Sequence, residues 1–565
     1  GTINEACHVF AVQTQKDMNW KKALASDQHP EAIKALNKEL TSLQKTILTE
    51  ITDAHPEWFT TAKQKAVPGR ILLDIKRSGE YKARGVKQGF KEDKETADGP
   101  DFSYYSHVAK LLSIRIALLR ARRGSRKVRI KDVRTAYLQA HKYPPGIVKY
   151  TCFRMPDTGK WRYFRQSGPI YGEASAAVRW EDTIAPWLEE MGFERGKNDK
   201  CVFYHPTRDL IVILYVDDCL IDGATEDADW ICDELDKRFD CKDTEHLEPG
   251  TTLDYLGFEV SLTDTHLHIG IRDYIQNCLI KLHQEDSKPA DTPISSEIDT
   301  DSGDLDFTQK RTFLTALGML GWIANVRPDV SYAHSRIGQH AATPSQSALK
   351  TVIRAFRYLK GTMDLAITIP LRESVDLSTH RIGSSHHQSA ANDWEFYCDT
   401  DHAGNSEDQN KRRSQNGVIA LCNGAPVLWA SKVSSVAFAH PDIGEAHADV
   451  SSAAAEIYGA ANATFELLHL SYIADEMGMD FPKPIVLQMD NEAARCFVAN
   501  SVTKSRLKHI DCRQEWVQVL RNKNILKTQH IDSHLNLADI FTKILPKDTF
   551  QGIVARLLSQ RHTED

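Results

Sequence analysis

Residues 209–222 read DLIVILYVDDCLID, an apolar run interrupted by the adjacent aspartates Asp217 and Asp218. The apolar residues are mostly Leu, Ile and Val, as in strands that are buried on both faces. Adjacent carboxylates repel each other and favour water, so they do not fit the middle of a buried strand. The pattern therefore predicts a tight hairpin with residues 216–218 at its solvent-facing tip and with both arms buried.

A third acid, Asp132, ends the short strand-like run at residues 127–133. If this strand lies beside the hairpin, three carboxylates meet at one edge of a sheet. Such a cluster repels itself unless cations neutralise it, and grouped carboxylates suit Mg²⁺. Two such ions about 3.5–4 Å apart can hold the attacking and leaving oxygens of a phosphoryl displacement. The Tyr-x-Asp-Asp string alone is weak, because an Asp-rich turn explains it as well.

The length of 565 residues predicts several domains, at roughly 100–200 residues for each. A hydrophobic content of 41% and a charged content of 26% are typical of soluble globular proteins. Neither a transmembrane run nor a signal peptide is visible, and the missing initiator Met suggests a fragment or a processed polyprotein. Eleven cysteines without a C-x-x-C pair indicate reduced thiols in an intracellular compartment rather than a zinc site.

The net charge of −7 hides a basic segment at residues 63–131, which holds 19 Lys/Arg against 7 Asp/Glu. Its densest part is RARRGSRKVRIK, residues 120–131. A basic block inside an acidic protein suggests that a polyanion lies against it. The alternative is a solvated helix end and loop.

A separate α/β unit is expected from Trp394 onward, in the order three strands, helix, strand, helix, strand, helix. Four acids fall at strand ends or on helices in this unit: Asp399, Glu456, Asp490 and, at the start of the last helix, Asp539. They could converge on one sheet edge and would again need Mg²⁺. Asp401 is an alternative to Asp399, although the strand-end position favours Asp399.

The first set of motifs resembles the reverse transcriptases of copia-type (Pseudoviridae) long-terminal-repeat retrotransposons. LIVILYVDDCLIDG resembles their catalytic motif, and KDVRTAYLQA (131–140) resembles their first aspartate motif, Leu-Asp-Val-x-x-Ala-Phe-Leu. YKARGVKQGF (81–90) is similar to their Tyr-Lys-Ala-Arg-Leu-Val-Ala-Arg-Gly-Phe segment. LDYLGFEV, NVRPDVSYAHSRIGQH and IRAFRYLKGT follow in the family's order, so the resemblance extends from about Trp20 to Pro546.

The resemblance implies an RNA-directed DNA polymerase whose catalytic and metal-binding residues are Asp132, Asp217 and Asp218. It places Tyr137 under the incoming sugar, where the ring would exclude a 2′-hydroxyl. It assigns Lys82 and Arg84 to the triphosphate. The alternative for Tyr137 is an ordinary aromatic residue of the core. The alternative for Lys82 and Arg84 is that they are solvated charges on a hairpin.

One segment departs from the family pattern. The family has Leu-Tyr-Gly-Leu-Lys-Gln-Ala-Pro-Arg where this chain has IYGEASAAVRW, residues 170–180. Tyr171 and Gly172 are kept, whereas Ala174 replaces Lys and Ser175 replaces the Gln that packs near the nucleotide. The departure leaves open a catalytically decayed element that only binds nucleic acid. A DNA-templated polymerase or a repair nuclease is a further alternative.

The four C-terminal acids resemble, in order and layout, the catalytic set of ribonuclease H. EFYCDTDHAGN, QMDNEAA and NLADIFTKILP are similar to three of its motifs, while Ala454 replaces a Glu of the second motif and Glu456 is kept. The resemblance implies that Asp399, Glu456, Asp490 and Asp539 bind metal and cut the RNA strand of an RNA–DNA hybrid.

The implied fold is a multidomain α+β and α/β protein, a right-hand polymerase followed by a ribonuclease H-like domain. The expected regions are an N-terminal helical segment (1–60), fingers (61–131), palm with remaining fingers (132–260), thumb and connection (261–390) and the ribonuclease H-like domain (391–565). The implied cofactor is Mg²⁺, or Mn²⁺, with two ions in each site. The implied partners are RNA template, DNA primer, RNA–DNA hybrid and dNTPs, with no membrane, in cytoplasmic virus-like particles or the nucleus.

Overall fold

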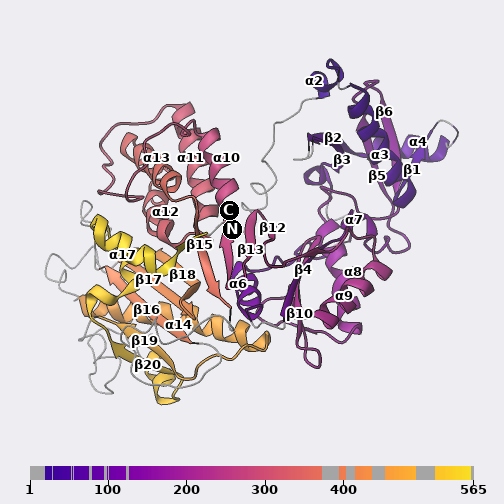
Figure 1. Cartoon of the computed structure of the whole chain (residues 1–565). Coiled ribbons are helices and arrows are strands. Elements are labelled where there is room, and N and C mark those ends of the chain that lie inside the picture. The colour runs from indigo at the N-terminus through magenta and orange to yellow at the C-terminus, as the bar shows by residue number, and fades with distance from the viewer. Residues whose placement is uncertain are drawn as a thin grey trace. The chain divides into compact units, whose positions relative to one another are not determined.

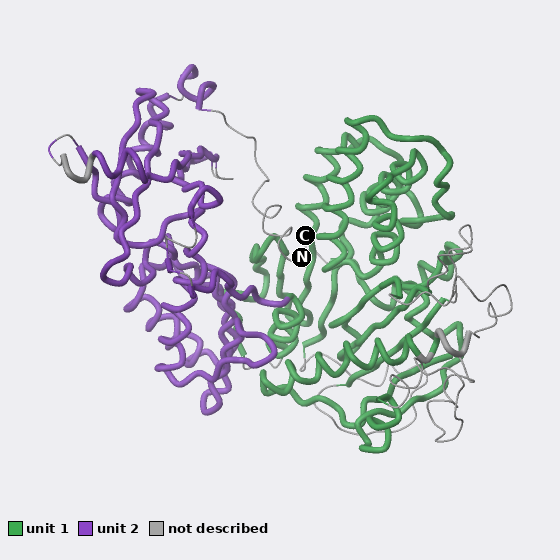
Figure 2. The backbone as a smooth tube through the Cα atoms, turned by 180° about the vertical axis from the view of Figure 1, so that it is seen from behind, with its two compact units in different colours: residues 1–10, 111–128, 246–565 green, residues 11–110, 129–245 purple. Residues whose placement is uncertain are grey.

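The computed structural model describes residues 20–27, 29–52, 54, 56–75, 79–93, 98–99, 101–122, 126–371, 393–401, 414–434, 452–490 and 516–561. The chain forms two compact units (Figure 2). Unit 1 comprises residues 1–10, 111–128 and 246–565, and unit 2 comprises residues 11–110 and 129–245. Helix α6 (Leu111–Arg120) therefore belongs to unit 1 although unit 2 precedes and follows it in the sequence.

Unit 2 contains a five-stranded sheet with the order β1-β6-β5-β2-β3 (Figure 1). Its strands are β1 (Leu48–Ile51), β2 (Val67–Ile75), β3 (Tyr81–Lys87), β5 (Lys149–Arg154) and β6 (Trp161–Gln166). Strands β2 and β3 form an antiparallel hairpin, whereas β2 and β5 run parallel. Helix α3 (His29–Thr46) has apolar residues at helical spacing and buries them in a core that includes Phe153 and Phe164.

A second sheet has the order β11-β4-β10-β9-β8-β7. Its strands are β4 (Arg126–Asp132), β7 (Glu194–Arg195), β8 (Val202–His205), β9 (Leu210–Tyr215), β10 (Asp218–Ala224) and β11 (Glu245–His246). Helices α8 (Ala176–Glu190) and α9 (Thr225–Arg238) bury Trp180, Leu188 and Leu235 against the apolar side chains of β9 and β10. The short helix α7 (Ala136–Gln139) follows β4.

Unit 1 contains an antiparallel sheet with the order β12-β13-β14-β15-β21. Its strands are β12 (Thr252–Tyr255), β13 (Phe258–Leu262), β14 (His266–Gly270), β15 (Leu365–Pro370) and β21 (Ser559–Gln560). A group of helices lies between β14 and β15 in the sequence: α10 (Arg272–Lys281), α11 (Phe307–Ile323), η2 (Pro328–Val330), α12 (Ser331–Gly338) and α13 (Gln346–Gly361). Of these, helices α11 and α13 begin at residues whose side chains cap the helix, Asp306 and Ser345.

The C-terminal part of unit 1 is a second sheet with the order β18-β17-β16-β19-β20. Strands β16 (Trp394–Asp401), β17 (Gln415–Cys422) and β18 (Ala425–Val433) are antiparallel. Strands β19 (Ile485–Met489) and β20 (Leu526–His530) run parallel to β16. Helix α14 (Ser452–Glu476) packs on β16 and β17. The mixed α/β multidomain class that the sequence predicts is confirmed.

The prediction that Asp539 lies at the start of the last helix is wrong. Residues Leu537–Phe541 make the short 3-10 helix η5, after η4 (Ser533–Leu535), and the last helix is α17 (Lys547–Leu557). The side chain of Asn536 accepts from the N–H of Ala538 and so starts η5. Pro546 then disfavours the α conformation in the residue before it, which leaves little room for a long helix. The helix expected after the fourth strand of this unit, at residues 491–500, lies outside the described residues.

Four basic side chains of the densest basic stretch, residues 120–131, are internal. Arg120, Arg122, Arg129 and Lys131 are buried. Lys131 Nζ lies 2.7 Å from a carboxylate oxygen of Asp236, so this charge is neutralised inside the fold. Burial takes these four side chains out of reach of a polyanion, whereas a polyanion against the wider segment 63–131 stays a prediction.

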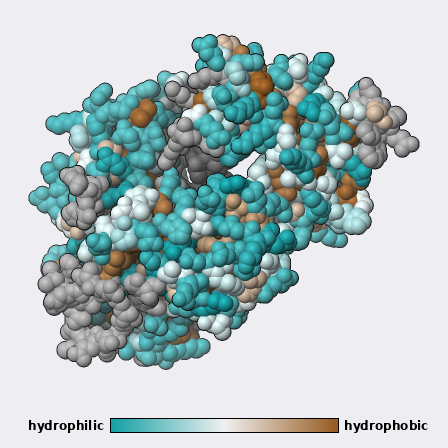
Figure 3. All heavy atoms as spheres, turned by 45° about the vertical axis from the view of Figure 1, so that its right-hand side comes forward, coloured by the Kyte–Doolittle hydropathy of each residue, from teal (hydrophilic) through white to brown (hydrophobic). Residues whose placement is uncertain are grey.

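The face of the molecule in Figure 3 is mostly hydrophilic, with apolar side chains scattered over it. Within the part of the chain that the structure describes, none of the helices has the length and apolar character needed to cross a membrane.

Candidate functional site

The apolar run with two aspartates forms the hairpin β9–β10. Tyr215 pairs with Asp218, which leaves Val216 and Asp217 as a two-residue loop. The arms are buried as predicted, but the tip is half-buried rather than open to solvent. Val216 has φ +59°, which a β-branched residue rarely adopts, and its carbonyl accepts a 2.6 Å hydrogen bond from Nε1 of Trp180. Helix α8 therefore holds the tip in a strained conformation.

Asp132 lies at the end of β4, which neighbours β10 in the sheet. The N–H of the next residue, Val133, donates to the carbonyl oxygen of Asp217 at 2.8 Å. A side-chain ion pair joins Asp132 to Lys242, which follows α9 in the sequence. Lys242 is not among the residues that the sequence predicts for this site, since nothing local marks a contact across 110 residues.

The charges of these acids act on one another. Burial raises the pKa of Asp218 to about 7, and the negative charges of Asp217 and Asp132 add to this effect. Burial and Asp132 also raise the pKa of Asp217. A cation at this point would favour the ionised carboxylates, so the donor set fits a divalent ion. Among the described residues, the group whose ligand atoms all lie within 4.8 Å of one another is the second cluster, which does not include these three acids.

The aromatic residue expected next to the first cluster, Tyr137, lies in α7 and is half-buried. Burial raises its pKa to about 12, and the nearby charge of Asp217 contributes. Its ring packs against the ring of Tyr171, with centroids 5.5 Å apart. Tyr137 is therefore both a packed aromatic residue and a neighbour of the acids.

The two cations expected at the triphosphate, Lys82 and Arg84, lie on β3. They alternate with the buried residues Ala83 and Gly85, so they share the more exposed face of the hairpin. The pKa of Asp217 is raised by burial and by Asp132, and the charge of Arg84 partly opposes this rise, whereas Lys82 is exposed. The structure thus brings Arg84 within electrostatic reach of the acids, and the role of Lys82 stays a prediction.

The second acidic cluster is tighter. Asp399, Glu456 and Asp490 each offer a carboxylate oxygen, and the three oxygens lie within 4.8 Å of one another. Asp399 and Glu456 are buried. Three oxygen ligands with this spacing fit a hard divalent cation such as Mg²⁺.

Sheet geometry explains why these acids meet. Strands β16 and β19 are parallel, so Asp399 near the end of one and Asp490 just after the other reach the same edge. Glu456 comes from α14, which approaches β16 closely at Gly459. A Cβ there would lie 1.8 Å from Oγ1 of Thr400, so only glycine permits the contact.

The fourth acid, Asp539, is buried in η5 beside this group. Burial and the charge of Asp399 raise its pKa to about 7. Nζ of Lys543 lies 3.0 Å from Oδ1 of Asp539 and 3.5 Å from Oδ2 of Asp399, and Thr542 donates to Asp399. Lys543 is not among the residues that the sequence predicts for this site, although it stands four residues after Asp539. Asp401 does not belong to the group of close ligand atoms, and the choice of Asp399 over Asp401 as the catalytic acid stays a prediction.

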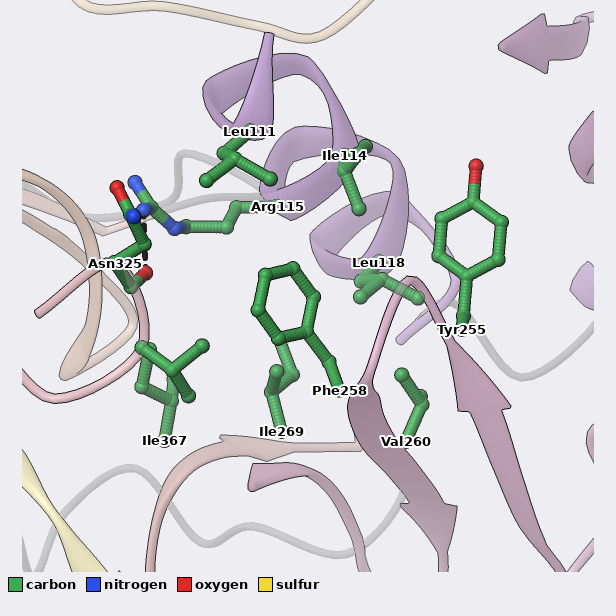
Figure 4. Close-up of a pocket in the computed structure, with 11 residues that line it drawn as sticks. Leu111, Ile114, Arg115, Leu118, Tyr255, Phe258, Val260, Ile269, Asn325 and Ile367 are labelled. Atoms are coloured by element: carbon green, nitrogen blue, oxygen red, sulfur yellow. Dashed lines mark hydrogen bonds between the residues drawn. The ribbon is translucent and has the colours of Figure 1, made fainter. Parts of the chain in front are cut away.

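An apolar pocket in unit 1 lies between α6 and strands β12–β15 (Figure 4). Leu111, Ile114 and Phe258 point into it, and Arg115 closes one end by donating to the carbonyl oxygen of Asn325 at 2.6 Å. The lining contains no acid of either cluster, so this pocket is a packing feature of α6 rather than part of the acidic sites.

Comparison with known families locates one domain. Residues 60–296 match the family described as "Reverse transcriptase (RNA-dependent DNA polymerase)". This range contains the first acidic cluster together with Lys82, Arg84 and Tyr137.

Related proteins extend the likeness over most of the chain. It is 28% and 29% identical to the retrovirus-related Pol polyproteins from transposons RE1 and RE2 of Arabidopsis thaliana, over 97% of its own length. It is 25% identical, over 96% of its length, to the Pol polyprotein from transposon TNT 1-94 of Nicotiana tabacum. The chain spans 34% of the first two relatives and 39% of the third. The resemblance to copia-type retrotransposon proteins is confirmed.

A solved structure of the foamy viral protease-reverse transcriptase in complex with RNA/DNA hybrid aligns with 94% of this chain and 63% of its own. The TM-score is 0.43 and the sequence identity is 10%.

Proposed function

We propose that this chain, which carries the reverse transcriptase domain of a copia-type retrotransposon Pol polyprotein, extends a primer 3′-hydroxyl with dNTPs on an RNA or DNA template. Asp132, Asp217 and Asp218 are the catalytic carboxylates. The observation that carries the proposal is the hydrogen bond from Val133 to Asp217, which joins the two aspartate motifs inside the matched domain.

The three carboxylates would hold two Mg²⁺ ions, or Mn²⁺. Bound ions would polarise the reacting phosphate and stabilise the attacking and leaving oxygens. The raised pKa values of Asp217 and Asp218 support this, because a self-repelling, partly buried acid cluster gains most from bound cations. Lys242 holds Asp132 as a counter-ion in the same place.

Nucleotide binding is assigned to β3 and α7. Arg84 and Lys82 share one face of β3 and would contact the triphosphate. The guanidinium of an arginine and the ammonium group of a lysine both donate hydrogen bonds to phosphate oxygens. Tyr137 would lie under the deoxyribose and exclude a 2′-hydroxyl sterically. Its position next to Asp217 supports this role.

We further propose that the C-terminal acids cut the RNA strand of the RNA–DNA hybrid that the polymerase makes. Asp399, Glu456, Asp490 and Asp539 would hold two Mg²⁺ ions, which would activate a water molecule for hydrolysis. The supporting observation is the close approach of three carboxylates from three separate elements. Lys543 would balance the charge of Asp539 and Asp399.

The proposed partners are RNA template, DNA primer and their hybrid. Phosphate contacts would dominate affinity, so binding should weaken steeply with salt. The hybrid would be recognised by its shape and 2′-hydroxyls rather than by sequence.

The test is dTTP incorporation on poly(rA)/oligo(dT) with Mg²⁺ by the purified chain. The wild type should incorporate dTTP and Asp217→Asn should not, while thermal melts show that both are folded. Equal activities would contradict the polymerase assignment.

A further inference from the structure

A buried cluster of charged side chains lies between the ends of β3, β5 and β6 and the start of α8. Its side chains are at most 10% exposed. Among the described residues, positive and negative groups are equal in number: Lys87, Lys149 and Arg179 against Glu92, Asp98 and Glu173. Burying so many charges is costly unless each is paired and hydrogen-bonded, so the cluster needs an explanation beyond stability.

Glu173 is the centre of the cluster. Its carboxylate accepts from the hydroxyl of Tyr143 at 2.7 and 2.8 Å and from Nζ of Lys149 at 2.8 Å. Nε2 of Gln166 and Oγ of Ser175 donate to it at 3.0 and 2.8 Å. Both carboxylate oxygens therefore have partners from separate elements, which fixes the side chain.

Two lysines keep Glu173 ionised. Burial alone would raise its pKa, but Lys87 and Lys149 lower that pKa below its ordinary value. Lys87 Nζ lies 3.7 Å from Glu173 and bonds to Glu92 and Gln166 at 2.8 and 2.9 Å.

The backbone before Glu173 is docked on the end of β3. Lys87 N–H donates to Tyr171 O at 2.7 Å, and Gly89 N–H donates to Gly172 O at 3.0 Å. Gly172 has φ +78°, and a Cβ there would lie 2.3 Å from the carbonyl oxygen of Lys87. The cluster therefore fixes the backbone on which Tyr171 is carried.

Tyr171 connects this cluster to the first acidic site. Its ring packs against Tyr137, and the charge of Asp217 acts on both hydroxyls. A shift of Tyr171 would remove the support behind the ring that we assign to the deoxyribose.

We propose that Glu173, neutralised by Lys87 and Lys149, is a positioning residue that sets deoxynucleotide selection through Tyr171 and Tyr137. The inference rests on the proposed polymerase function and deepens it.

The departures from the family pattern support this role. The pattern has Leu at the position of Glu173, Gln at that of Ser175 and Ala at that of Lys87. In this chain Glu173 contacts both of the other replacements, Lys87 and Ser175, so each of the two has its partner in the same cluster. The segment is therefore a rebuilt support of the site rather than an eroded one.

The experiment measures kcat and KM of the full chain for dTTP and for UTP on poly(rA)/oligo(dT). Glu173→Gln should lower the preference for dTTP over UTP by about tenfold or more, mainly through KM for dTTP, because small displacements at a reacting group are costly. Tyr171→Leu, which keeps the buried cluster, should lower the preference similarly.

A compensating pair tests the charge balance. Glu173→Leu alone removes one carboxylate partner from each of two buried lysines, Lys87 and Lys149. This variant should lose both the preference for dTTP over UTP and thermal stability. Lys87→Ala combined with Glu173→Leu removes one charge of each sign and should recover most of both. This double variant keeps the test valid if the single variant does not fold.

Glu50→Gln is the matched control, since it breaks an ion pair with Arg162 in the same sheet. It should leave the dTTP preference unchanged. If Glu173→Gln and Tyr171→Leu keep the wild-type preference while dTTP incorporation is normal, the inference is overturned and the polymerase assignment stands. If the wild type incorporates no dTTP, both are overturned.

Discussion

The N–H of Val133 donates to the carbonyl oxygen of Asp217 at 2.8 Å, and this bond ties the strand that ends in Asp132 to the tip of the β9–β10 hairpin. Two segments that lie far apart in the sequence thereby present their acids at one place. The same tip is held from the other side by Trp180. The geometry of the first acidic cluster thus depends on backbone contacts as well as on the acids.

Trp180→Phe should loosen this tip. The substitution removes the Nε1 donor and leaves the carbonyl of Val216 without it, which should cost about 1–3 kcal/mol in the free energy of unfolding. Primer extension should fall further than stability explains, because Val216 is then free to leave its strained conformation. Urea unfolding and primer extension check this. Trp187→Phe, whose ring packs on the same Phe239, is the control, and equal DNA synthesis by the two variants would contradict the account.

Tyr137 should control the choice of sugar. Tyr137→Val removes the ring and should raise UTP incorporation relative to dTTP by about tenfold or more. Tyr137→Phe keeps the ring and should discriminate as the wild type does. Steady-state kinetics with the two nucleotides give the comparison. A Val variant with unchanged discrimination would show that the ring does not face the sugar.

Lys543 should influence metal binding at the second acidic cluster. Lys543→Met removes the cation that pairs with Asp539 and Asp399, so the carboxylates repel one another more strongly without metal. The melting temperature should fall in EDTA and should rise more on adding Mg²⁺ than that of the wild type.

The matched control for Lys543 is Lys547→Met, which breaks an exposed pair with Asp291 at 3.2 Å. Differential scanning fluorimetry with EDTA and with Mg²⁺ makes the comparison. Equal Mg²⁺-induced shifts for the two variants would argue against a role for Lys543 at the cluster.

The ion pair between Glu50 and Arg162 should contribute to stability in a defined pH range. The hydrogen bond from Arg162 lowers the pKa of Glu50 below its ordinary value of 4.5. A lowered pKa in the folded state stabilises the protein above the unfolded pKa, and this contribution is lost as the pH falls through the folded value. The difference in free energy of unfolding between wild type and Glu50→Gln should therefore be present at neutral pH and shrink below about 4.5.

Urea unfolding at a series of pH values measures that difference. Because the pair is partly exposed, the effect should be small and should weaken with salt. A difference that grows as the pH falls would have the wrong sign for this pair.

Sequence periodicity and local chemistry predict much of this molecule. The apolar arms around Asp217 and Asp218 predict the hairpin, and strand ends predict that Asp399 and Asp490 meet at one edge. These predictions depend on short-range rules: alternation, turn residues and the direction of neighbouring strands.

The remaining features depend on contacts between distant segments. Lys131 belongs to the densest basic stretch of the chain, yet it lies inside the fold beside Asp236. Nothing near Lys242 marks it as the partner of Asp132. In the sequence, Glu173 is only a departure from the family pattern, which has Leu at this position. Its buried partners Lys149 and Lys87 show that it belongs to a charged cluster. Such pairings have no periodic sequence pattern, because the two partners are distant in the sequence and meet only in the folded chain.

The central claim is that this chain has two separate acidic centres, one for DNA synthesis and one for RNA cleavage. One assay follows both: an RNA template and a DNA primer with different labels, dNTPs and Mg²⁺, with the wild type, Asp217→Asn and Asp490→Asn compared. The wild type should extend the primer and cut the template. Asp217→Asn should lose extension but still cut a preformed hybrid, and Asp490→Asn should extend but not cut. The claim would be contradicted if either folded variant lost both extension and cleavage. It would also be contradicted if both variants kept both activities.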